Sequence, residues 1–255
     1  MKDISKKNPT NNTGHKQRLD SFLVQNGYAT SRTVAHTLID SGLVTVDEVV
    51  VLKRNRIVKF GDDVKVKPAQ TFVGRGAEKL HYAFDVNNMI VNPGSVALDI
   101  GSSTGDFTDA LLQLGVDKVY AVDVGTDQLD KRLLANTKVV SMEGVDIRNI
   151  DELYEKVQII VCDVSFVSLR HIIPVLKKFH GEVVDIFLLV KPQFEVGRQL
   201  LGKKGVVKDK SIQLLSLLDI TSFAEEEGYR VVSAVESFPR GKTGNLEYVL
   251  YLKCI

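Results

Sequence analysis

The segment Asp99-Ile-Gly-Ser-Ser-Thr-Gly-Asp-Phe-Thr108 constrains the fold more than any other part of the chain. It lies between two apolar runs, Ser95-Val-Ala-Leu98 and Ala110-Leu-Leu112. This order predicts a buried strand, a tight glycine turn and the start of a helix. Ligands of open α/β sheets bind at the carboxyl ends of strands, where glycine lets backbone N–H groups approach them closely. Val119-Tyr-Ala-Val-Asp123 predicts a second strand, which ends in a carboxylate able to accept both hydroxyls of a ribose, so we expect a nucleoside cofactor.

From residue 95 onward, apolar β-prone runs alternate with helical periodicity, which predicts an α/β fold with a mostly parallel sheet covered on both faces. Residues 237–245 alone join the last two predicted strands and leave no room for a crossover helix, so these strands should pair antiparallel. A Rossmann-like seven-stranded sheet with one reversed strand near its C-terminal edge is typical of S-adenosylmethionine (SAM)-dependent methyltransferases. The predicted strands are residues 95–100, 118–123, 137–142, 157–163, 183–190, 229–236 and 246–252, and the predicted helices are residues 77–85, 105–115, 126–135, 168–179 and 209–227.

A smaller α+β unit precedes this sheet. Residues 17–68 show two helical patterns followed by short β-prone runs, with glycine turns between them. Residues 1–16 carry few apolar side chains, so we expect a flexible tail there. Residues 69–76 form a short predicted linker, and residues 77–255 form the larger domain.

The charge is distributed unevenly between these parts. The chain carries +1 overall, but residues 1–76 hold 13 Lys and Arg against 7 Asp and Glu, a net charge of +6, and the remainder therefore carries −5. A basic appendage on a mildly acidic body suggests that the appendage meets a polyanion. A chance imbalance on solvated faces explains the charge alone equally well.

The composition is that of an ordinary globular protein, 44% hydrophobic and 25% charged. The longest apolar run, near residues 183–190, is too short to span a bilayer. The polar N-terminus does not have the pattern of a secretory signal. Cys162 and Cys254 provide neither a disulfide framework nor a metal cluster. We therefore expect a cytoplasmic protein with no metal and no membrane partner.

The glycine turn favours SAM over NAD. A dinucleotide site expects Gly-x-Gly-x-x-Gly, whereas this turn reads Gly101-x-x-x-Gly105. SAM has no phosphate; it carries an ammonium group, a ribose and an adenine. Asp99 suits the ammonium group, Asp123 the ribose and Asp146 the adenine amino group.

The chemistry should lie where strands four and five end. Asp163 follows strand four, Lys191 follows strand five just before a proline, and Glu247 opens the last strand from the same edge. Such a set can bind a polar nucleophile and tune its proton. Asp163-Val-Ser-Phe lacks the Asn/Asp-Pro-Pro-Tyr pattern of base N-methylation, and Cys162 reads as a core residue instead of the nucleophile of cytosine C5-methylation. Attack by a ribose hydroxyl fits the residues best.

Three motifs in the first unit together resemble an S4 RNA-binding domain. They are Arg18-Leu-Asp-x-Phe-Leu, Ser31-Arg-x-x-Ala-x-x-Leu-Ile-x-x-Gly-x-Val-x-Val46 and Gly61-Asp-x-Val-x-Val66. The resemblance implies binding to structured RNA, which proteins read largely by shape and backbone. For Arg32, capping or bracing of the second helix is an alternative role. The implied RNA-binding residues are Arg18, Ser31, Arg32, Lys53, Arg54 and Arg56, together with Arg75 in the linker.

The larger domain resembles the TlyA (hemolysin A-like) family, ribosomal RNA ribose 2′-O-methyltransferases with an S4 domain before an FtsJ-like domain. The resemblance rests on Val73-Gly-Arg-Gly-Ala-Glu-Lys79-Leu, the glycine turn, Asp163-Val-Ser-Phe166, Leu189-Val-Lys-Pro-Gln-Phe-Glu195 and Gly244-Asn-x-Glu247. It implies a catalytic tetrad of Lys79, Asp163, Lys191 and Glu247, although periodicity alone makes Lys79 a solvated lysine. It also implies ribosomal RNA or ribosomal subunits as partner. The implied SAM-binding residues are Asp99, Gly101, Ser102, Ser103, Thr104, Gly105, Phe107, Asp123 and Asp146.

Two departures from the family pattern stand out. Gly74-Arg-Gly-Ala77 replaces Ser-Arg-Gly-Gly, and Gly105-Asp-Phe107 replaces Gly-Gly-Phe. Asp106 either favours a helix N-terminus or weakens SAM binding. Alternative functions are a non-catalytic RNA-binding or ribosome-assembly factor and a hemolysin-type virulence protein, although no segment here has the pattern of a membrane-lytic helix.

Overall fold

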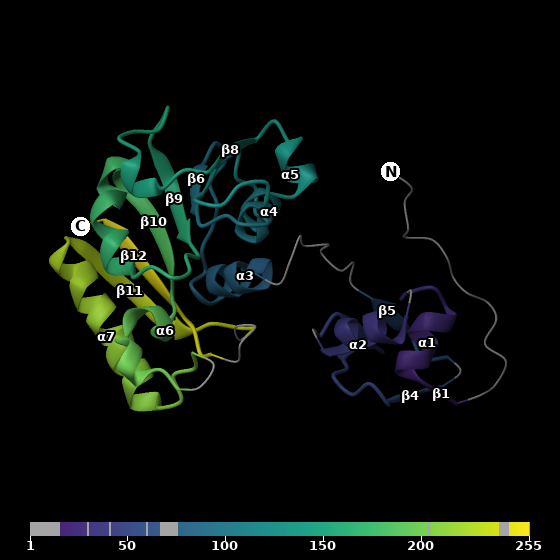
Figure 1. Ribbon diagram of the computed structural model, residues 1–255. Coiled ribbons are helices and arrows are strands. Elements are labelled where there is room, and N and C mark those ends of the chain that lie inside the picture. Colours follow the sequence, from purple (N-terminus) through teal and green to yellow (C-terminus); the bar gives the residue numbers. More distant parts are fainter. Residues whose placement is uncertain are drawn as a thin grey trace. The chain divides into compact units, whose positions relative to one another are not determined.

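The computed structural model describes residues 16–29, 31–40, 42–59, 61–66, 76–202, 205–239 and 245–254. The chain divides into two compact units, Met1–Thr71 and Phe72–Ile255 (Figure 1). Residues 1–15 of the predicted tail and residues 69–75 of the predicted linker lie outside the described residues.

The first unit packs two helices, α1 (Leu19–Gln25) and α2 (Arg32–Asp40), against short antiparallel strands. Strand β2 (Val44–Val46) lies between β3 (Val49–Val50) and β5 (Val64–Val66), and β1 (Gln17–Arg18) pairs with β4 (Ile57–Val58). The helical spacing of apolar residues in α1 and α2 turns one face of each helix inward. The core of this unit includes Leu19, Phe22, Leu23, Leu38, Ile39, Val44 and Val58.

The second unit is built on a seven-stranded sheet in the order β11-β12-β10-β9-β6-β7-β8. Strand β12 is antiparallel to both of its neighbours, and the ladders among β6 to β10 are parallel. The predicted reversed strand is therefore confirmed. The strands are β6 (Val96–Ile100), β7 (Lys118–Asp123), β8 (Val139–Glu143), β9 (Val157–Cys162), β10 (His180–Val190), β11 (Tyr229–Glu236) and β12 (Tyr248–Cys254).

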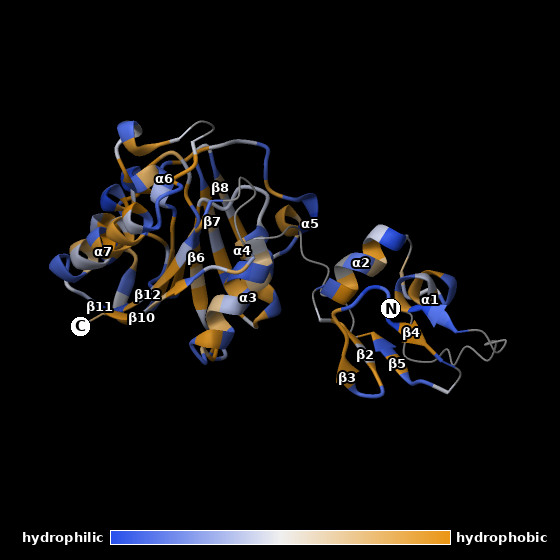
Figure 2. Cartoon of the chain, turned by 90° about the horizontal axis from the view of Figure 1, so that it is seen from below, coloured by the Kyte–Doolittle hydropathy of each residue, from blue (hydrophilic) through white to orange (hydrophobic). Residues whose placement is uncertain are grey.

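Helices cover both faces of the sheet. On one face, α3 (Gly76–Val86) and α4 (Asp106–Gln113) pack Leu80, Phe84 and Leu111 against Phe187 and its neighbours. On the other face, α7 (Lys210–Glu226) and the connecting segments pack on Ile160, Ile186 and Leu250. Strands buried on both faces need apolar residues throughout, and the hydrophobic colouring runs along the central strands in Figure 2.

Two predicted helices are wrong in length or type. Residues 126–135 contain only α5 (Lys131–Leu134), because Gly125 and Asp127 begin an irregular turn, with Asp127 at φ +57°, that ends where Asp130 caps α5. Residues 168–179 form two 3₁₀ segments, η2 (Leu169–His171) and η3 (Ile173–Lys178). Pro174 lacks an N–H group, and its β-branched neighbours disfavour a regular α-helix. The remaining short helices, which periodicity did not predict, are η1 (Ile147–Asn149), α6 (Pro192–Glu195) and η4 (Arg198–Leu200).

None of the helices in the described ranges combines the length and apolar character that crossing a membrane requires.

Phe187 lies at the centre of the core between α3, α4 and the sheet, so its substitution tests this packing. Phe187 is 1% exposed, and its ring centroid lies 4.4 Å from that of Tyr251, in a stack, and 4.7 Å from that of Phe84. Phe187→Ala should lower the free energy of unfolding of this unit by about 3–5 kcal/mol, since it removes a large buried ring. Leu215→Ala, at a position that is 63% exposed, should change it by less than about 0.5 kcal/mol. Urea unfolding followed by hydrogen exchange in β10 measures the free energy of unfolding of each variant. Equal losses of stability in Phe187→Ala and Leu215→Ala would contradict the packing described.

Candidate functional site

Two adjoining cavities open at the carboxyl ends of the parallel strands in the second unit. The cofactor cavity, of about 570 Å³, is lined by residues that include Asp123, Gly125 and Asp146. The rim cavity, of about 370 Å³, is lined by residues that include the four predicted catalytic side chains. Five residues line both cavities, so the two spaces meet: Gly101, Ser103, Asp163, Ser165 and Phe166.

The glycine turn after β6 lies against the chain that leaves β9. Gly101 has φ +80°, and a Cβ placed there would lie 2.9 Å from the backbone oxygen of Asp163. The N–H groups of Gly101 and Ser102 both donate to the carbonyl of Val122. Ser102 Oγ is buried and has no hydrogen-bond partner in the described part of the chain. The turn is therefore a cradle without side-chain bulk and with a free polar atom, which fits a bound nucleoside cofactor.

Asp123 fixes the far side of this turn. Its two carboxylate oxygens accept hydrogen bonds from the N–H groups of Ser103, at 2.8 Å, and Gly125, at 2.7 Å. A carboxylate oxygen can accept a second bond, so Asp123 can still receive a ribose hydroxyl at the cavity wall.

Asp146 also lines the cofactor cavity, but Arg148 holds it. The carboxylate caps η1 through the Arg148 N–H group, at 3.0 Å, and forms an ion pair with the guanidinium at 2.5 Å. This hydrogen bonding by Arg148 lowers the pKa of Asp146 below its usual value. Asp146 therefore stays ionised as an acceptor.

Asp99 lies behind the turn and does not line either cavity. It is 0% exposed, and its Oδ2 accepts a hydrogen bond from Thr108 Oγ1 at 2.6 Å. Burial raises the pKa of Asp99 to about 7. Two other predicted SAM-binding residues, Thr104 and Phe107, line the rim cavity. Gly105 faces the side chains of Leu129 and Leu133 instead. Asp99 Oδ1 is buried and has no hydrogen-bond partner in the described part of the chain, so contact with an ammonium group stays a prediction for it.

The four predicted catalytic side chains line the rim cavity as two ion pairs. Lys79 Nζ, from α3, lies 2.6 Å from Glu247 Oε2, and Lys191 Nζ, after β10, lies 2.5 Å from Asp163 Oδ1. The Lys79, Lys191 and Glu247 side chains are at most 11% exposed, and that of Asp163 is 25% exposed. Lys191 Nζ also donates to Ser165 Oγ at 3.0 Å. Charges this buried persist only when they are paired, so each carboxylate fixes its lysine in place.

Cys162 is excluded as a nucleophile. It is fully buried in the central strand β9, and burial raises the pKa of its thiol to about 12. A thiol without appreciable thiolate at neutral pH cannot attack a base.

Phe166, for which no role is predicted from the sequence, lines both cavities. It is 92% exposed and adopts φ +67°, and its ring centroid lies 5.1 Å from that of Phe194. Phe194 in turn lies under Lys191, with Nζ 5.9 Å from the ring centroid. A bulky residue in the left-handed region is a strained conformation that often marks functional sites. Its position directly after Asp163-Val-Ser was the only sequence signal.

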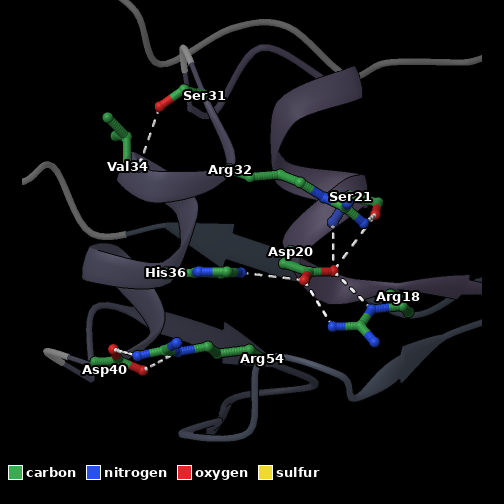
Figure 3. A network of polar contacts seen from close by, with 9 residues as sticks. All are labelled: Arg18, Asp20, Ser21, Ser31, Arg32, Val34, His36, Asp40 and Arg54. Atoms are coloured by element: carbon green, nitrogen blue, oxygen red, sulfur yellow. Dashed lines mark hydrogen bonds and ion pairs between the residues drawn. The ribbon is translucent and has the colours of Figure 1, made fainter.

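In the first unit, carboxylates hold two of the predicted RNA-binding arginines, Arg18 and Arg54. Figure 3 shows Arg18, Ser21 and His36 converging on Asp20, whose side chain is 2% exposed. Arg18 approaches Asp20 to 2.8 Å and His36 approaches it to 3.2 Å. The bonds from the Arg18 guanidinium keep the pKa of Asp20 far below its usual range.

The remaining candidates of that unit divide between bonded and exposed residues. Arg54 forms a bidentate pair with Asp40, and Arg32 donates to Ser21 Oγ at 2.9 Å, which matches the bracing role considered for it. Ser31 Oγ accepts from the N–H group of Val34 at the start of α2, at 3.3 Å. Lys53 and Arg56 are exposed, and Arg75 lies outside the described residues.

Known proteins match this chain along both units. Residues 72–254 match the family described as FtsJ-like methyltransferase, and residues 17–64 match the S4 domain. The 16S/23S rRNA (cytidine-2′-O)-methyltransferase TlyA of Mycobacterium tuberculosis is 36% identical over 93% of this chain and 90% of its own. Hemolysin A of Brachyspira hyodysenteriae is 36% identical over 92% of this chain and 98% of its own.

A solved structure agrees with these matches. A candidate hemolysin from Streptococcus thermophilus superposes with a TM-score of 0.70 at 35% identity, over 94% of this chain and 88% of that one. A SAM-dependent methyltransferase fold from Listeria monocytogenes, at 14% identity and a TM-score of 0.52, shares the fold of the larger unit. The chain therefore belongs to the TlyA family of FtsJ-like, SAM-dependent methyltransferases that carry an S4 domain.

Proposed function

We propose that this protein transfers a methyl group from SAM to the 2′-hydroxyl of a cytidine in ribosomal RNA. The observation that carries the proposal is the pair of buried lysine–carboxylate ion pairs in the rim cavity, next to a cavity suited to a nucleoside. The TlyA relative is named for cytidine 2′-O-methylation of 16S and 23S rRNA. A 2′-hydroxyl is neutral and weakly acidic, so it must be oriented and its proton must be accepted.

Residues that line the cofactor cavity suit the nucleoside part of SAM. Asp123 would accept the ribose hydroxyls, Asp146 would face the adenine, and the turn at Gly101 would admit the sulfonium side of the molecule. When bound, SAM would supply an activated methyl group.

In the reaction, Lys79 orients the attacking hydroxyl, and Lys191, as the neutral amine that has first given up its own proton to solvent, receives the proton of that hydroxyl. Asp163 and Glu247 hold these lysines within the cavity and balance their charge. The oxygen–methyl bond forms as the sulfur–methyl bond breaks, and one proton leaves the hydroxyl for each methyl group transferred. Phe166 and Phe194 offer aromatic faces beside the cavity on which the displaced base could stack.

We further propose that the first unit delivers the RNA. Arg18 and Arg54 are pre-oriented by Asp20 and Asp40, which lowers the entropy lost when a guanidinium contacts a phosphate. Lys53 and Arg56 lie exposed on the segment between β3 and β4 and can add contacts to the RNA backbone.

A side chain added at the glycine turn should weaken cofactor binding. Gly101→Ala places a methyl group against the backbone of Asp163, so S-adenosylhomocysteine should bind at least about tenfold more weakly. Gly115→Ala is the matched control, because Gly115 has φ +98° but nothing within 4 Å of a new Cβ. It should cost about 1 kcal/mol of stability and leave affinity unchanged. Calorimetry with the full chain measures the affinity of each variant for S-adenosylhomocysteine. Wild-type affinity in Gly101→Ala would contradict this cofactor site.

Removing one lysine should stop the chemistry without removing the cofactor. Lys191→Met should lower kcat on intact ribosomal subunits by about 10²–10⁴-fold, the range of a lost acid–base group. Affinity for S-adenosylhomocysteine should stay within about twofold. Lys118→Met, which breaks the half-exposed ion pair with Glu155, should keep full activity. Transfer of label from methyl-labelled SAM is the readout, and full activity of Lys191→Met would refute the assignment.

A further inference from the structure

One carboxylate of the rim cavity has no basic partner in the described part of the chain. Three acidic residues line this cavity: Asp106, Asp163 and Glu247. Asp163 and Glu247 each form an ion pair with a lysine. Asp106 forms no ion pair with any described residue.

Neutral donors hold this carboxylate in a fixed orientation. Asp106 Oδ2 accepts a hydrogen bond from the N–H group of Gly76 at 2.7 Å, and Oδ1 accepts one from Thr104 Oγ1 at 3.0 Å. Each oxygen can accept one more bond. The side chain is therefore pre-organised, charged and able to receive a cation.

Its place in the chain puts Asp106 beside the cofactor. It is the first residue of α4, directly after the glycine turn that ends at Gly105. The cofactor cavity holds the residues suited to a nucleoside, and it meets the rim cavity at this turn. The substituent of a nucleoside bound in the first cavity would therefore have a route to Asp106 through the space that the two cavities share.

Asp99, which the sequence pattern favours for the ammonium group, is poorly placed for it. It is 0% exposed, does not line either cavity and is bonded to Thr108.

We infer that the Asp106 carboxylate binds the ammonium group on the amino-acid part of SAM. The inference rests on the proposed function, which supplies the cofactor. A charge-assisted hydrogen bond between a carboxylate and an ammonium group is among the stronger polar contacts. Asp106 thus strengthens SAM binding. This is the opposite of one of the two effects expected from the sequence, in which its negative charge weakens SAM binding.

The test compares two probes on the full chain. S-adenosylhomocysteine carries the ammonium group, whereas 5′-methylthioadenosine has the same nucleoside and a thioether sulfur but no amino acid. Asp106→Asn keeps an oxygen for the Gly76 N–H group and removes the charge. In calorimetry, Asp106→Asn should lower the affinity for S-adenosylhomocysteine by about tenfold or more and leave the affinity for methylthioadenosine within about twofold of the wild-type value.

Asp109→Asn is the matched control, because it removes the same charge from the first turn of α4 at a position outside the cavity lining. It should leave both affinities unchanged. The inference is overturned if Asp106→Asn binds S-adenosylhomocysteine as the wild type does, if it weakens both probes equally, or if Asp109→Asn has the same effect. If the wild type binds neither probe, the proposed function fails, and the assignment of Asp106 fails with it.

Discussion

The site depends on one close approach, that of the Gly101 backbone to the backbone of Asp163. A Cβ at Gly101 would come within 2.9 Å of the Asp163 oxygen, so the two strand ends can meet only because this residue is glycine. The Asp163 N–H group also donates to the carbonyl of Ile100 at 3.0 Å. This contact places the cofactor turn directly beside the carboxylate that fixes Lys191, and so it joins the cofactor cavity to the rim cavity.

The order of the strands completes the arrangement. Neighbours in the sheet run β12, β10, β9, β6 and β7, so Glu247, Lys191, Asp163, Gly101 and Asp123 follow one another along a single edge. Strand β12 runs opposite to β10, and its first residues therefore lie where the parallel strands end. The reversed strand is thus what brings Glu247 to Lys79. Because both lysines are buried with a partner, loss of either partner would leave an uncompensated charge, which links the stability of the site to its chemistry.

Much of this was predictable from residue patterns, and the exceptions have physical causes. The apolar runs predict the strands of the sheet, because burial on both faces demands apolar residues throughout. The short connection between the last two strands predicts the reversed strand, and the ends of the runs show which residues follow each strand. Lys79 was not predictable from periodicity, since its partner lies far along the chain and only the fold brings the two together. Asp99 and Asp106 show the same limit: a carboxylate next to a turn can face inward or toward the ligand, and only the packing of Thr108 and Gly76 decides which.

The chemical form of the product tests the central claim most directly. Ribosomal subunits treated with the protein and methyl-labelled SAM would be extracted, and their RNA hydrolysed in alkali. A methylated 2′-oxygen cannot attack the neighbouring phosphodiester, so we expect label in alkali-resistant dinucleotides that contain 2′-O-methylcytidine. Label recovered in mononucleotides that carry a methylated base would contradict it.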